Sequence, residues 1–461
     1  MLGVLALHDT ATGSVAELQL RDPKTVSMYV CGPTVYGPPH VGHGRTTLVY
    51  DVLRRYLESR GLQVRHVSNV TDIDDNIINR ARREGRDWRE VATECEAQWW
   101  AAMGALGLLR PNEVPHATEY VEQMIGLVDQ LLTSGAAYQT SDGVYLAASE
   151  LPGYGLLAHQ SLDSLRAGAR VELTEEKRSS VDFALWKAAK PGEPMWSSPF
   201  GEGRPGWHTE CVVMSLELLG DDFDLHGGGQ DLMFPHHENE RAQAIASGHR
   251  FTRHWMHNGL VTVSGEKMSK SLGNFTTLAE LLEQSDPRAY RLLVLQAHYR
   301  SPLEVTGDTL RDAAGAPSRL DTMARRFRGV PYDADEAVAL AEEARFVAAM
   351  EDDLDTPRAI ASLFEAVRRA HGLEDVGEHR PAAALAAKVV ELFGSLGVEV
   401  GGGGEGEGAP EAAIRALVER RDAARSARDF AAADALRADL EAAGWTVEDT
   451  PQGTKIHRKA P

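Results

Sequence analysis

The strongest constraint on the fold lies in residues 28–46, which read MYVCGPTVYGPPHVGHGRT. The apolar run at the start predicts a short buried strand, and the glycines and prolines that follow exclude regular structure. Apolar residues then recur at helical spacing, which predicts an amphipathic helix over 45–60. His40 and His43 are therefore expected at a helix N-terminus. Because unpaired backbone N–H groups and the positive end of the helix dipole meet there, the turn is predicted to bind an anion such as phosphate.

A second string lies far downstream, where residues 267–271 read KMSKS in a Gly- and Ser-rich loop. Taken alone, the His-Val-Gly-His string at 40–43 fits a pair of polar helix caps equally well. Together, the two strings resemble the HIGH and KMSKS signatures of class I aminoacyl-tRNA synthetases, with Val41 in place of the usual Ile. The resemblance implies that His40, His43, Lys267 and Lys270 are the catalytic residues.

Four further segments narrow the resemblance to the cysteinyl-tRNA synthetases, and the similarity runs over nearly the whole chain. They are CGPTVY at 31–36, NVTDIDD at 69–75, GRPGWHTEC at 203–211 and HGGGQDLMFPHHENE at 226–240. The family implies an ATP-dependent ligase that converts L-cysteine to cysteinyl-adenylate and transfers it to the 3′ end of tRNA(Cys).

Composition bounds the class of protein and its compartment. The chain has 461 residues, 43% of them apolar, with no run approaching the roughly 20 apolar residues of a membrane span. The N-terminus lacks the basic region of a signal peptide, and three cysteines in so long a chain favour a reducing compartment. We therefore expect a cytoplasmic protein with no membrane partner.

Charge leaves RNA binding open. The net charge of -20 is unfavourable for a nucleic-acid partner, because phosphates are neutralised by Lys and Arg. Basic clusters nevertheless occur at 80–83, 325–328 and 420–421, and local charge matters more than the total.

The order of predicted elements indicates an α/β fold with a Rossmann-like, doubly wound parallel sheet. A connective insertion interrupts the sheet, and an α-helical bundle and a small mixed α/β C-terminal domain follow it. The predicted parts are 1–110 and 206–315 (the two halves of the catalytic domain), 111–205 (the insertion), 316–400 (a tRNA-binding type of bundle), 401–408 (a Gly-rich linker) and 409–461 (an anticodon-binding domain).

Four residues that are far apart in the sequence form a candidate metal set: Cys31, Cys211, His236 and Glu240. His236 and Glu240 are spaced i,i+4 and face the same side of a helix, and thiolate, imidazole and carboxylate all bind Zn²⁺. Spacing alone is weak evidence, because no Cys-x-x-Cys pair is present and a free Cys usually behaves as a small buried hydrophobe. The resemblance implies that these four hold one zinc ion. Cys95 matches no ligand position.

A metal suits cysteine selection, since serine differs from cysteine only by O for S and a shape pocket discriminates poorly between such near-isosteres. A soft metal that binds the substrate thiolate directly rejects the harder hydroxyl. The resemblance also implies that the amino-acid pocket is lined by Gly32, Thr34, Thr71, Trp207 and His208.

For ATP, the sequence offers a glycine run that ends at Gly229 and the carboxylate of Asp231, a candidate partner for ribose hydroxyls. A bare glycine run is weak evidence for any nucleotide. Lys267 and Lys270 can close over the triphosphate, which carries Mg²⁺, so that catalysis consists of positioning and electrostatic stabilisation. With His40 and His43, these residues form the predicted ATP site.

Two other functions stay open at this point. A cysteine ligase that transfers cysteine to an amino-sugar keeps the same activation site, but that relative lacks a C-terminal module like the one predicted after residue 408. An inactive RNA-binding paralogue is disfavoured by the intact His40, His43, Lys267 and Lys270. The expected partners are tRNA(Cys), ATP and L-cysteine, and the family implies a monomer.

Overall fold

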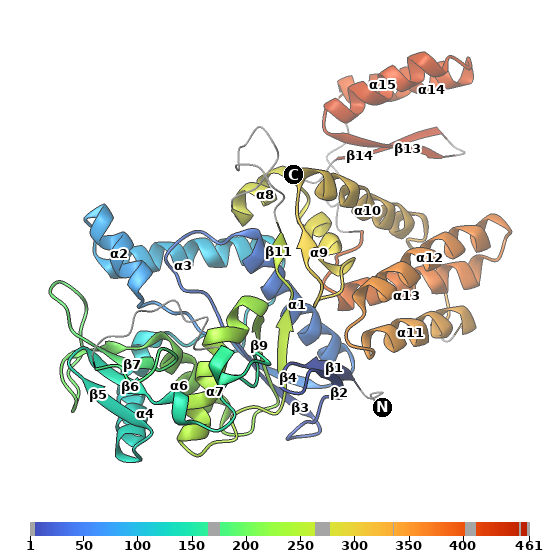
Figure 1. The fold of residues 1–461 in the computed structure, drawn as a ribbon. Coiled ribbons are helices and arrows are strands. Elements are labelled where there is room, and N and C mark those ends of the chain that lie inside the picture. The colour runs from blue at the N-terminus through green and yellow to red at the C-terminus, as the bar shows by residue number, and fades with distance from the viewer. Residues whose placement is uncertain are drawn as a thin grey trace.

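A four-stranded parallel sheet, in the order β10-β9-β3-β4, forms the centre of the computed structural model (Figure 1). The structure describes residues 5–164, 176–262, 277–334, 336–401, 412–450 and 453–458. The chain leaves β3 (Thr25–Val30) for β4 (Gln63–Val67) on one side, and later forms β9 (Leu225–Gly229) and β10 (Trp255–Asn258) on the other. The crevice between the ends of β3 and β9 is therefore the switch point at which open α/β sheets bind ligands. This confirms the predicted Rossmann-like fold.

Helix α1 (Val41–Ser59) follows the turn after β3 and packs its apolar face on the sheet. It begins four residues earlier than its apolar pattern predicts, since His40 caps it. The chain after β4 forms α2 (Asp75–Glu84) and α3 (Trp88–Ala105), each capped by an Asp side chain.

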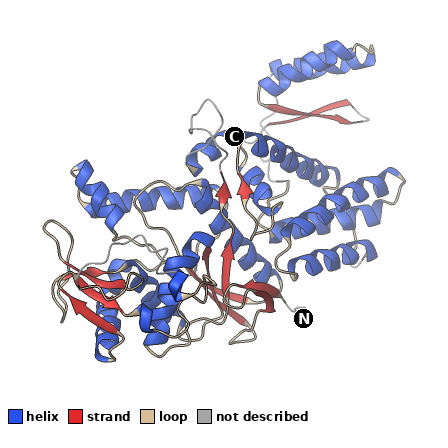
Figure 2. Cartoon of the chain, in the orientation of Figure 1, coloured by secondary structure: helices blue, strands red, loops and turns tan. Residues whose placement is uncertain are grey.

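The insertion forms a separate antiparallel sheet, and it shares an apolar core with residues of β3, β4 and β10 of the central sheet (Figure 2). Helix α4 (Val121–Thr133) precedes four strands in the order β5-β6-β7-β8, with bounds Ala137–Thr140, Gly143–Leu146, Phe183–Ala188 and Gly203–Pro205. Strand β8 leads directly into α6 (Trp207–Leu219), which returns the chain to the central sheet. Helix α7 (Glu238–Ala246) follows β9, after a π-helical turn over Met233–His237.

Helices dominate the chain beyond β10 and share one apolar core with α1 and the central sheet. Their bounds are α8 (Leu278–Gln284), α9 (Pro287–Leu295), α10 (Gly307–Arg326), α11 (Ala337–Met350), α12 (Thr356–Asp375) and α13 (His379–Ser395). A short parallel pair, β11 (Val261–Thr262) and β12 (Leu303–Glu304), joins them to the sheet. Helix α10 runs through residues 315 and 316, where the sequence predicts a boundary between the catalytic domain and the bundle.

The two ends of the chain form small units (Figure 1). An N-terminal hairpin joins β1 (Ala6–Asp9) to β2 (Ser14–Glu17). At the other end, α14 (Ala412–Ser426) and α15 (Phe430–Ala442) pack on a hairpin of β13 (Trp445–Thr450) and β14 (Gly453–Arg458). Most of the Gly-rich segment at 401–408 lies outside the described residues. No described helix is long and apolar enough to cross a membrane.

Candidate functional site

A cavity of about 350 Å³ opens at the C-terminal ends of β3 and β9. Its lining includes these residues predicted from the sequence: Cys31, Gly32, Thr34, His40, His43, Trp207, Gly229 and Asp231. The structure thus brings both signature histidines, part of the candidate metal set and the glycine run to one crevice. Lys267 and Lys270 lie outside the described residues.

His40 and His43 form a reciprocal cap at the start of α1. The backbone N–H of His43 donates to Nδ1 of His40 at 3.4 Å, and that of His40 donates to Nδ1 of His43 at 3.2 Å. Burial lowers the pKa of His40, and burial together with the neighbouring His40 lowers the pKa of His43 to about 3. Because Nδ1 of each neutral ring accepts a hydrogen bond, the proton of each ring lies on Nε2. Two neutral N–H donors therefore stand at the positive end of a helix, an arrangement suited to phosphate oxygens.

The glycine run is part of strand β9, whereas the sequence pattern predicts a strand that ends at residue 226. A Cβ at Gly227 would lie 2.3 Å from the ring of Tyr50, and a Cβ at Gly229 would lie 2.4 Å from the carboxylate of Asp231. The Tyr50 hydroxyl accepts a hydrogen bond from the backbone N–H of Gly228 at 2.6 Å. Glycine is thus required because α1 and Asp231 approach the strand closely.

The candidate metal set is assembled next to this cavity, which its member Cys31 lines. One ligand atom from each of Cys31, Cys211, His236 and Glu240 lies within 4.8 Å of the others, and all four residues are buried. Nε2 of His236 lies 2.9 Å from Oε1 of Glu240 and 3.6 Å from Sγ of Cys211. Sγ of Cys31 lies 3.4 Å from Oε1 of Glu240. Two thiols, an imidazole and a carboxylate in this proximity match the donors that Zn²⁺ accepts.

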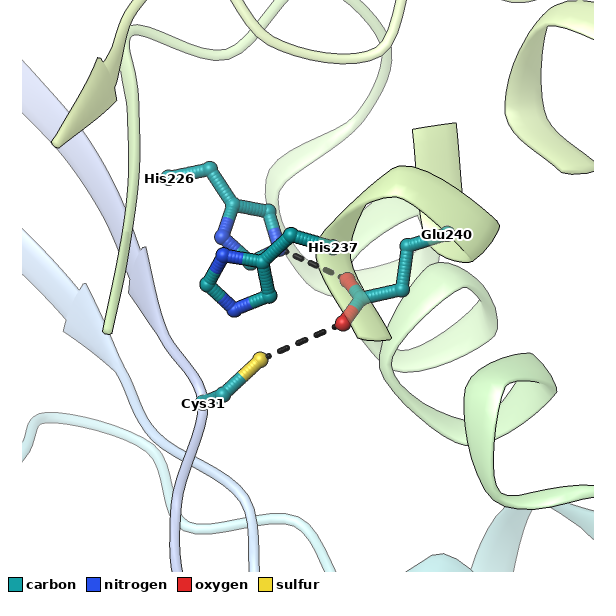
Figure 3. A group of neighbouring side chains, drawn as sticks. All are labelled: Cys31, His226, His237 and Glu240. Atoms are coloured by element: carbon teal, nitrogen blue, oxygen red, sulfur yellow. Dashed lines mark hydrogen bonds and ion pairs between the residues drawn. The ribbon is translucent and has the colours of Figure 1, made fainter. Parts of the chain in front are cut away.

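A second group of possible metal donors shares Cys31 and Glu240 and adds His226 and His237 (Figure 3). Nε2 of His226 lies 2.8 Å from Oε2 of Glu240, while Nδ1 of His237 lies 2.7 Å from Nε2 of His257. His226 thus contacts the Glu240 oxygen opposite the one near His236. The set with Cys211 has the additional thiol, so it has the softer donors and is the better zinc site.

The ionisation of the set follows from its burial and its close contacts. Burial alone raises the pKa of Cys211, but hydrogen bonding to Cys31 and His236 outweighs it and brings the pKa to about 7. Burial lowers the pKa of His236, but the Glu240 carboxylate raises it to about 10. Burial raises the pKa of Glu240, and His236 and His226 hold it well below its ordinary range. The group thus favours an ionised carboxylate and one readily ionised thiol.

Of the residues predicted to surround the amino acid, some line the cavity and others do not. Trp207 lines the cavity and stacks on the His236 ring at 4.1 Å between centroids. Among the described residues, Thr71 and His208 are not part of the lining. Nδ1 of His208 lies 2.8 Å from Nδ1 of His236, so it holds that ring from behind, as outer partners of metal ligands do. Thr71 pairs with Thr34 in an isolated parallel bridge.

Several residues of the site carry no assigned role in the sequence reasoning. Tyr50, His226 and Glu210 lie in segments whose motifs or helical pattern are recognisable, but those patterns predict roles only for neighbouring residues. Asn69 links two parts of the site, since its Oδ1 accepts from the backbone N–H of Gly32 at 2.9 Å and lies 3.7 Å from Sγ of Cys211. The NVTDIDD string was the signal that could have identified Asn69.

The C-terminal unit corrects one expectation about RNA contacts. The sequence suggests that Arg420, Arg421, Arg425 and Arg428, on one helical stretch, are suitable phosphate contacts. Arg421 is buried and pairs with Asp449 at 2.7 Å, and Arg425 pairs with the same carboxylate. These two guanidinium groups therefore attach α14 to the hairpin, because the acidic strand residue lies beside the helix.

Comparison with known proteins finds matches along almost the whole chain. The family model described as tRNA synthetases class I (C) catalytic domain matches residues 17–315. A DALR domain matches residues 345–400, and a cysteinyl-tRNA ligase anticodon binding domain matches residues 409–456.

Curated relatives and solved structures agree with these matches. The cysteine–tRNA ligase of Alkalilimnicola ehrlichii is 47% identical and that of Thermotoga maritima 42%, with 99% and 98% of this chain and 100% and 99% of the relatives aligned. In fold, the chain is similar to Mycobacterium tuberculosis methionyl-tRNA synthetase in complex with methionyl-adenylate, with a TM-score of 0.59 and 15% identity over 81% of this chain and 90% of that one. A putative arginyl-tRNA synthetase from Campylobacter jejuni gives a TM-score of 0.55 at 12% identity, over 83% of this chain and 94% of that one.

Proposed function

The chain belongs to the cysteine–tRNA ligases, a family of class I aminoacyl-tRNA synthetases, and on that premise we propose how its residues carry out the reaction. The activity is ATP-dependent ligation of cysteine to tRNA. In the first step the cysteine carboxylate attacks the α-phosphorus of ATP and releases pyrophosphate, and in the second the terminal ribose of the tRNA takes the cysteinyl group. The observation that carries the proposal is a buried pair of thiols, Cys31 and Cys211, of which Cys31 lines the same cavity as His40 and His43.

The metal is proposed to be one Zn²⁺ per chain, held by Cys31, Cys211, His236 and Glu240. The donor chemistry and the 4.8 Å proximity of the four ligand atoms support this choice. When bound, zinc favours a thiolate over a hydroxyl ligand, which separates cysteine from serine without an editing step. The chain orients these ligands through two further histidines. His208 contacts the ring of His236, and His226 contacts a carboxylate oxygen of Glu240.

ATP is proposed to lie across the N-terminus of α1 and the end of β9, with Mg²⁺ on its phosphates. The neutral Nε2–H groups of His40 and His43 would donate to phosphate oxygens, while Gly229 allows close backbone approach and Asp231 accepts from the ribose hydroxyls. Lys267 and Lys270 are proposed from the sequence to stabilise the charge that develops on the leaving pyrophosphate.

The amino-acid pocket is proposed to consist of Gly32, Thr34, Thr71, Trp207 and His208. Trp207 and Gly32 support this as cavity walls, and Thr34 pairs with Thr71 in an isolated parallel bridge. His208 acts through His236, which it holds in place.

The tRNA partner is proposed to be tRNA(Cys), bound by the 316–400 bundle and by an anticodon-binding unit at 409–461, beyond a linker at 401–408. We propose a monomer that works in the cytoplasm, with its two catalytic halves at 1–110 and 206–315 around the insertion at 111–205. The match of residues 409–456 to an anticodon binding domain supports tRNA as the acceptor over an amino-sugar.

Cysteine-dependent exchange of pyrophosphate into ATP, followed by charging of total tRNA, tests the proposal. Serine at a hundredfold excess should give no exchange, and an amino-sugar acceptor should give no transfer. Exchange without cysteine dependence, or transfer to the amino-sugar alone, would overturn the assignment of this site.

A further inference from the structure

One side of the cavity has no part in the proposed ATP and cysteine sites. It is formed by the loop after β3, the start of α2 and one turn of α3, and its lining includes Tyr36, Asp74, Asn76 and Trp100. Tyr36 differs from the others, because it is a large aromatic residue with 48% of its surface exposed. The guanidinium group of Arg110 lies over the Trp100 ring, 4.4 Å from its centroid. Tyr36 is therefore the more accessible aromatic ring on this side.

The backbone at Tyr36 is held in place by the protein. The carbonyl of Tyr36 accepts a hydrogen bond from Nη1 of Arg80 at 2.9 Å, and its N–H donates to the carbonyl of Thr34 at 3.0 Å. Nε of Arg80 pairs with Glu84 at 2.7 Å, which fixes the arginine in turn. Because the backbone is already ordered, a ligand that stacks on the ring loses little free energy to ordering the loop.

A stripe of polar residues leads outward along α2 from this side of the cavity. Asn76, Arg80 and Arg83 are spaced by four and then three residues, so they lie on one face of the helix over a length of about 10 Å. Arg80 is used within the protein, whereas Arg83 is exposed and forms no ion pair within the described parts of the chain. The basic cluster at 80–83 therefore offers an unpaired guanidinium group beyond the loop that carries Tyr36.

The charges along this path decide which part of a ligand each position suits. Asp74 caps α2 by accepting a hydrogen bond from the backbone N–H of Asn76 at 2.8 Å, and its carboxylate lies at the cavity. A phosphate is repelled there, whereas the amino group of a nucleobase can donate to a carboxylate. Farther out, Arg83 offers positive charge to a phosphate. The path thus suits a single strand of nucleic acid whose last base lies on the Tyr36 ring.

The reaction identifies this strand, and the step rests on the proposed function. The 3′ end of a tRNA is a single strand that ends in adenosine, and its terminal ribose has to reach the cysteinyl-adenylate in this cavity. The side near His40 is assigned to ATP and the side near Cys31 to cysteine, so the terminal base is left with the side at Tyr36. Figure 1 shows α2 and the C-terminal unit at opposite sides of the molecule, as two sites for the opposite ends of one tRNA require.

We infer that Tyr36 stacks on the terminal adenine of the tRNA and that Arg83 binds a phosphate of the same single strand. The stacked base places the terminal ribose beside the adenylate. Formation of cysteinyl-adenylate needs neither contact, because the tRNA takes part only in the second step. The two residues therefore act on tRNA binding and transfer.

The test of the stacking contact compares Tyr36→Ala with Tyr36→Phe, which keeps the ring. Dissociation constants are measured for intact tRNA(Cys) and for tRNA(Cys) without its terminal adenosine. The stacking of a base on an aromatic ring predicts that alanine weakens binding of the intact tRNA by about 5- to 150-fold and that phenylalanine changes it by less than about 2-fold. Binding of the shortened tRNA should change by less than about 2-fold in both variants, because it lacks the base that Tyr36 contacts.

The test of the phosphate contact is Arg83→Ala, with Arg83→Lys to restore the charge. Alanine should weaken binding of both tRNAs by the same factor and reduce the slope of log affinity against log salt by about 0.7, whereas lysine should keep the slope. Arg250→Ala is the matched control. Arg250 is exposed and precedes β10, so it lies at the edge of the parallel sheet opposite the cavity, and its removal should leave the slope unchanged.

Equal weakening of the two tRNAs by Tyr36→Ala, or unchanged binding of the intact tRNA, would overturn the stacking contact. A slope for Arg83→Ala equal to that for Arg250→Ala would overturn the phosphate contact. Cysteine-dependent exchange, which needs no tRNA, is measured for every variant and should stay within about 3-fold of wild type. Wild-type protein without this exchange would instead refute the proposed function, so the two failures are distinguishable.

Discussion

Tyr50→Phe tests whether α1 holds the glycine strand at the proposed ATP site. The Tyr50 hydroxyl accepts from the backbone N–H of Gly228 at 2.6 Å and donates to the carbonyl of Met256 at 2.7 Å. Tyr50 is completely buried, and its ring fills the space that a side chain at Gly227 would need. The substitution removes one oxygen and leaves this packing in place.

The expected loss follows from the two hydrogen bonds. A buried peptide N–H without a partner costs about 1–3 kcal/mol and the lost bond to the carbonyl about 1 kcal/mol, so unfolding should need roughly 2–4 kcal/mol less. Gly228 directly precedes Gly229, so displacement of the strand should also weaken ATP binding. A loss of about 1–2 kcal/mol of ATP binding free energy corresponds to a rise in the KM for ATP of roughly 5- to 30-fold. The KM for cysteine should change by less than about 2-fold, since the metal set and the cysteine pocket keep their contacts.

Tyr56→Phe is the matched control. Tyr56 is a fully buried tyrosine on the same helix, and within the described residues its hydroxyl has no hydrogen bond to the main chain. Its removal should lower the unfolding free energy by no more than about 1 kcal/mol and leave the KM for ATP unchanged. Urea unfolding and pyrophosphate exchange are measured for both variants. If Tyr50→Phe behaves like Tyr56→Phe, the hydroxyl does not hold the strand and the reasoning is refuted.

Four other predictions address the metal, the loop, the C-terminal unit and acid stability. Cys211→Ser should lose zinc and cysteine binding together, because a thiolate ligand is removed; metal analysis of wild type and variant checks this. Lys270→Ala should slow exchange by about 100-fold or more with little change in cysteine affinity, since its charge acts in the transition state; an unchanged rate would contradict that role. A chain that stops at Gly401 should form cysteinyl-adenylate but charge tRNA poorly, which side-by-side exchange and charging assays decide. Burial and Arg54 lower the pKa of His66 to about 3. As the pH falls below about 6.5, this histidine binds a proton in the unfolded chain but not in the folded one, so the folded state loses stability. His66→Leu should reduce that loss by about 1.4 kcal/mol per pH unit, as measured by urea unfolding at a series of pH values.

The sequence predicts those elements whose boundaries are marked locally. A helical apolar pattern between Gly206 and Gly220 predicts a helix over 207–219, and α6 has these bounds. The turn after β3 also has its predicted place, since prolines and glycines exclude other structure there.

Contacts between distant segments could not be predicted, because no periodic pattern marks them. Strand β9 continues through its glycines since the ring of Tyr50, far away in sequence, occupies the space of their side chains. The bonds of His226 to Glu240 and of His208 to His236 join segments whose motifs are recognisable, but a motif does not state which ring nitrogen faces which oxygen. The same holds for Arg421, whose pairing with Asp449 depends on how α14 packs on the hairpin.

The register of the central sheet links thiol selection to the fold. Cys31 comes from the first half of the sheet, whereas Cys211, His236 and Glu240 come from the second, beyond the insertion. The pairing of Tyr29 with His226, and the hydrogen bond from the Cys31 backbone N–H to the Gly227 carbonyl at 3.1 Å, bring the two halves together. Because successive residues of a strand face opposite sides, a slip of one residue between β3 and β9 would turn Cys31 away from the other donors. The metal set can therefore form only when both halves are folded in this one register, and a bound metal would in turn stabilise that register against the slip.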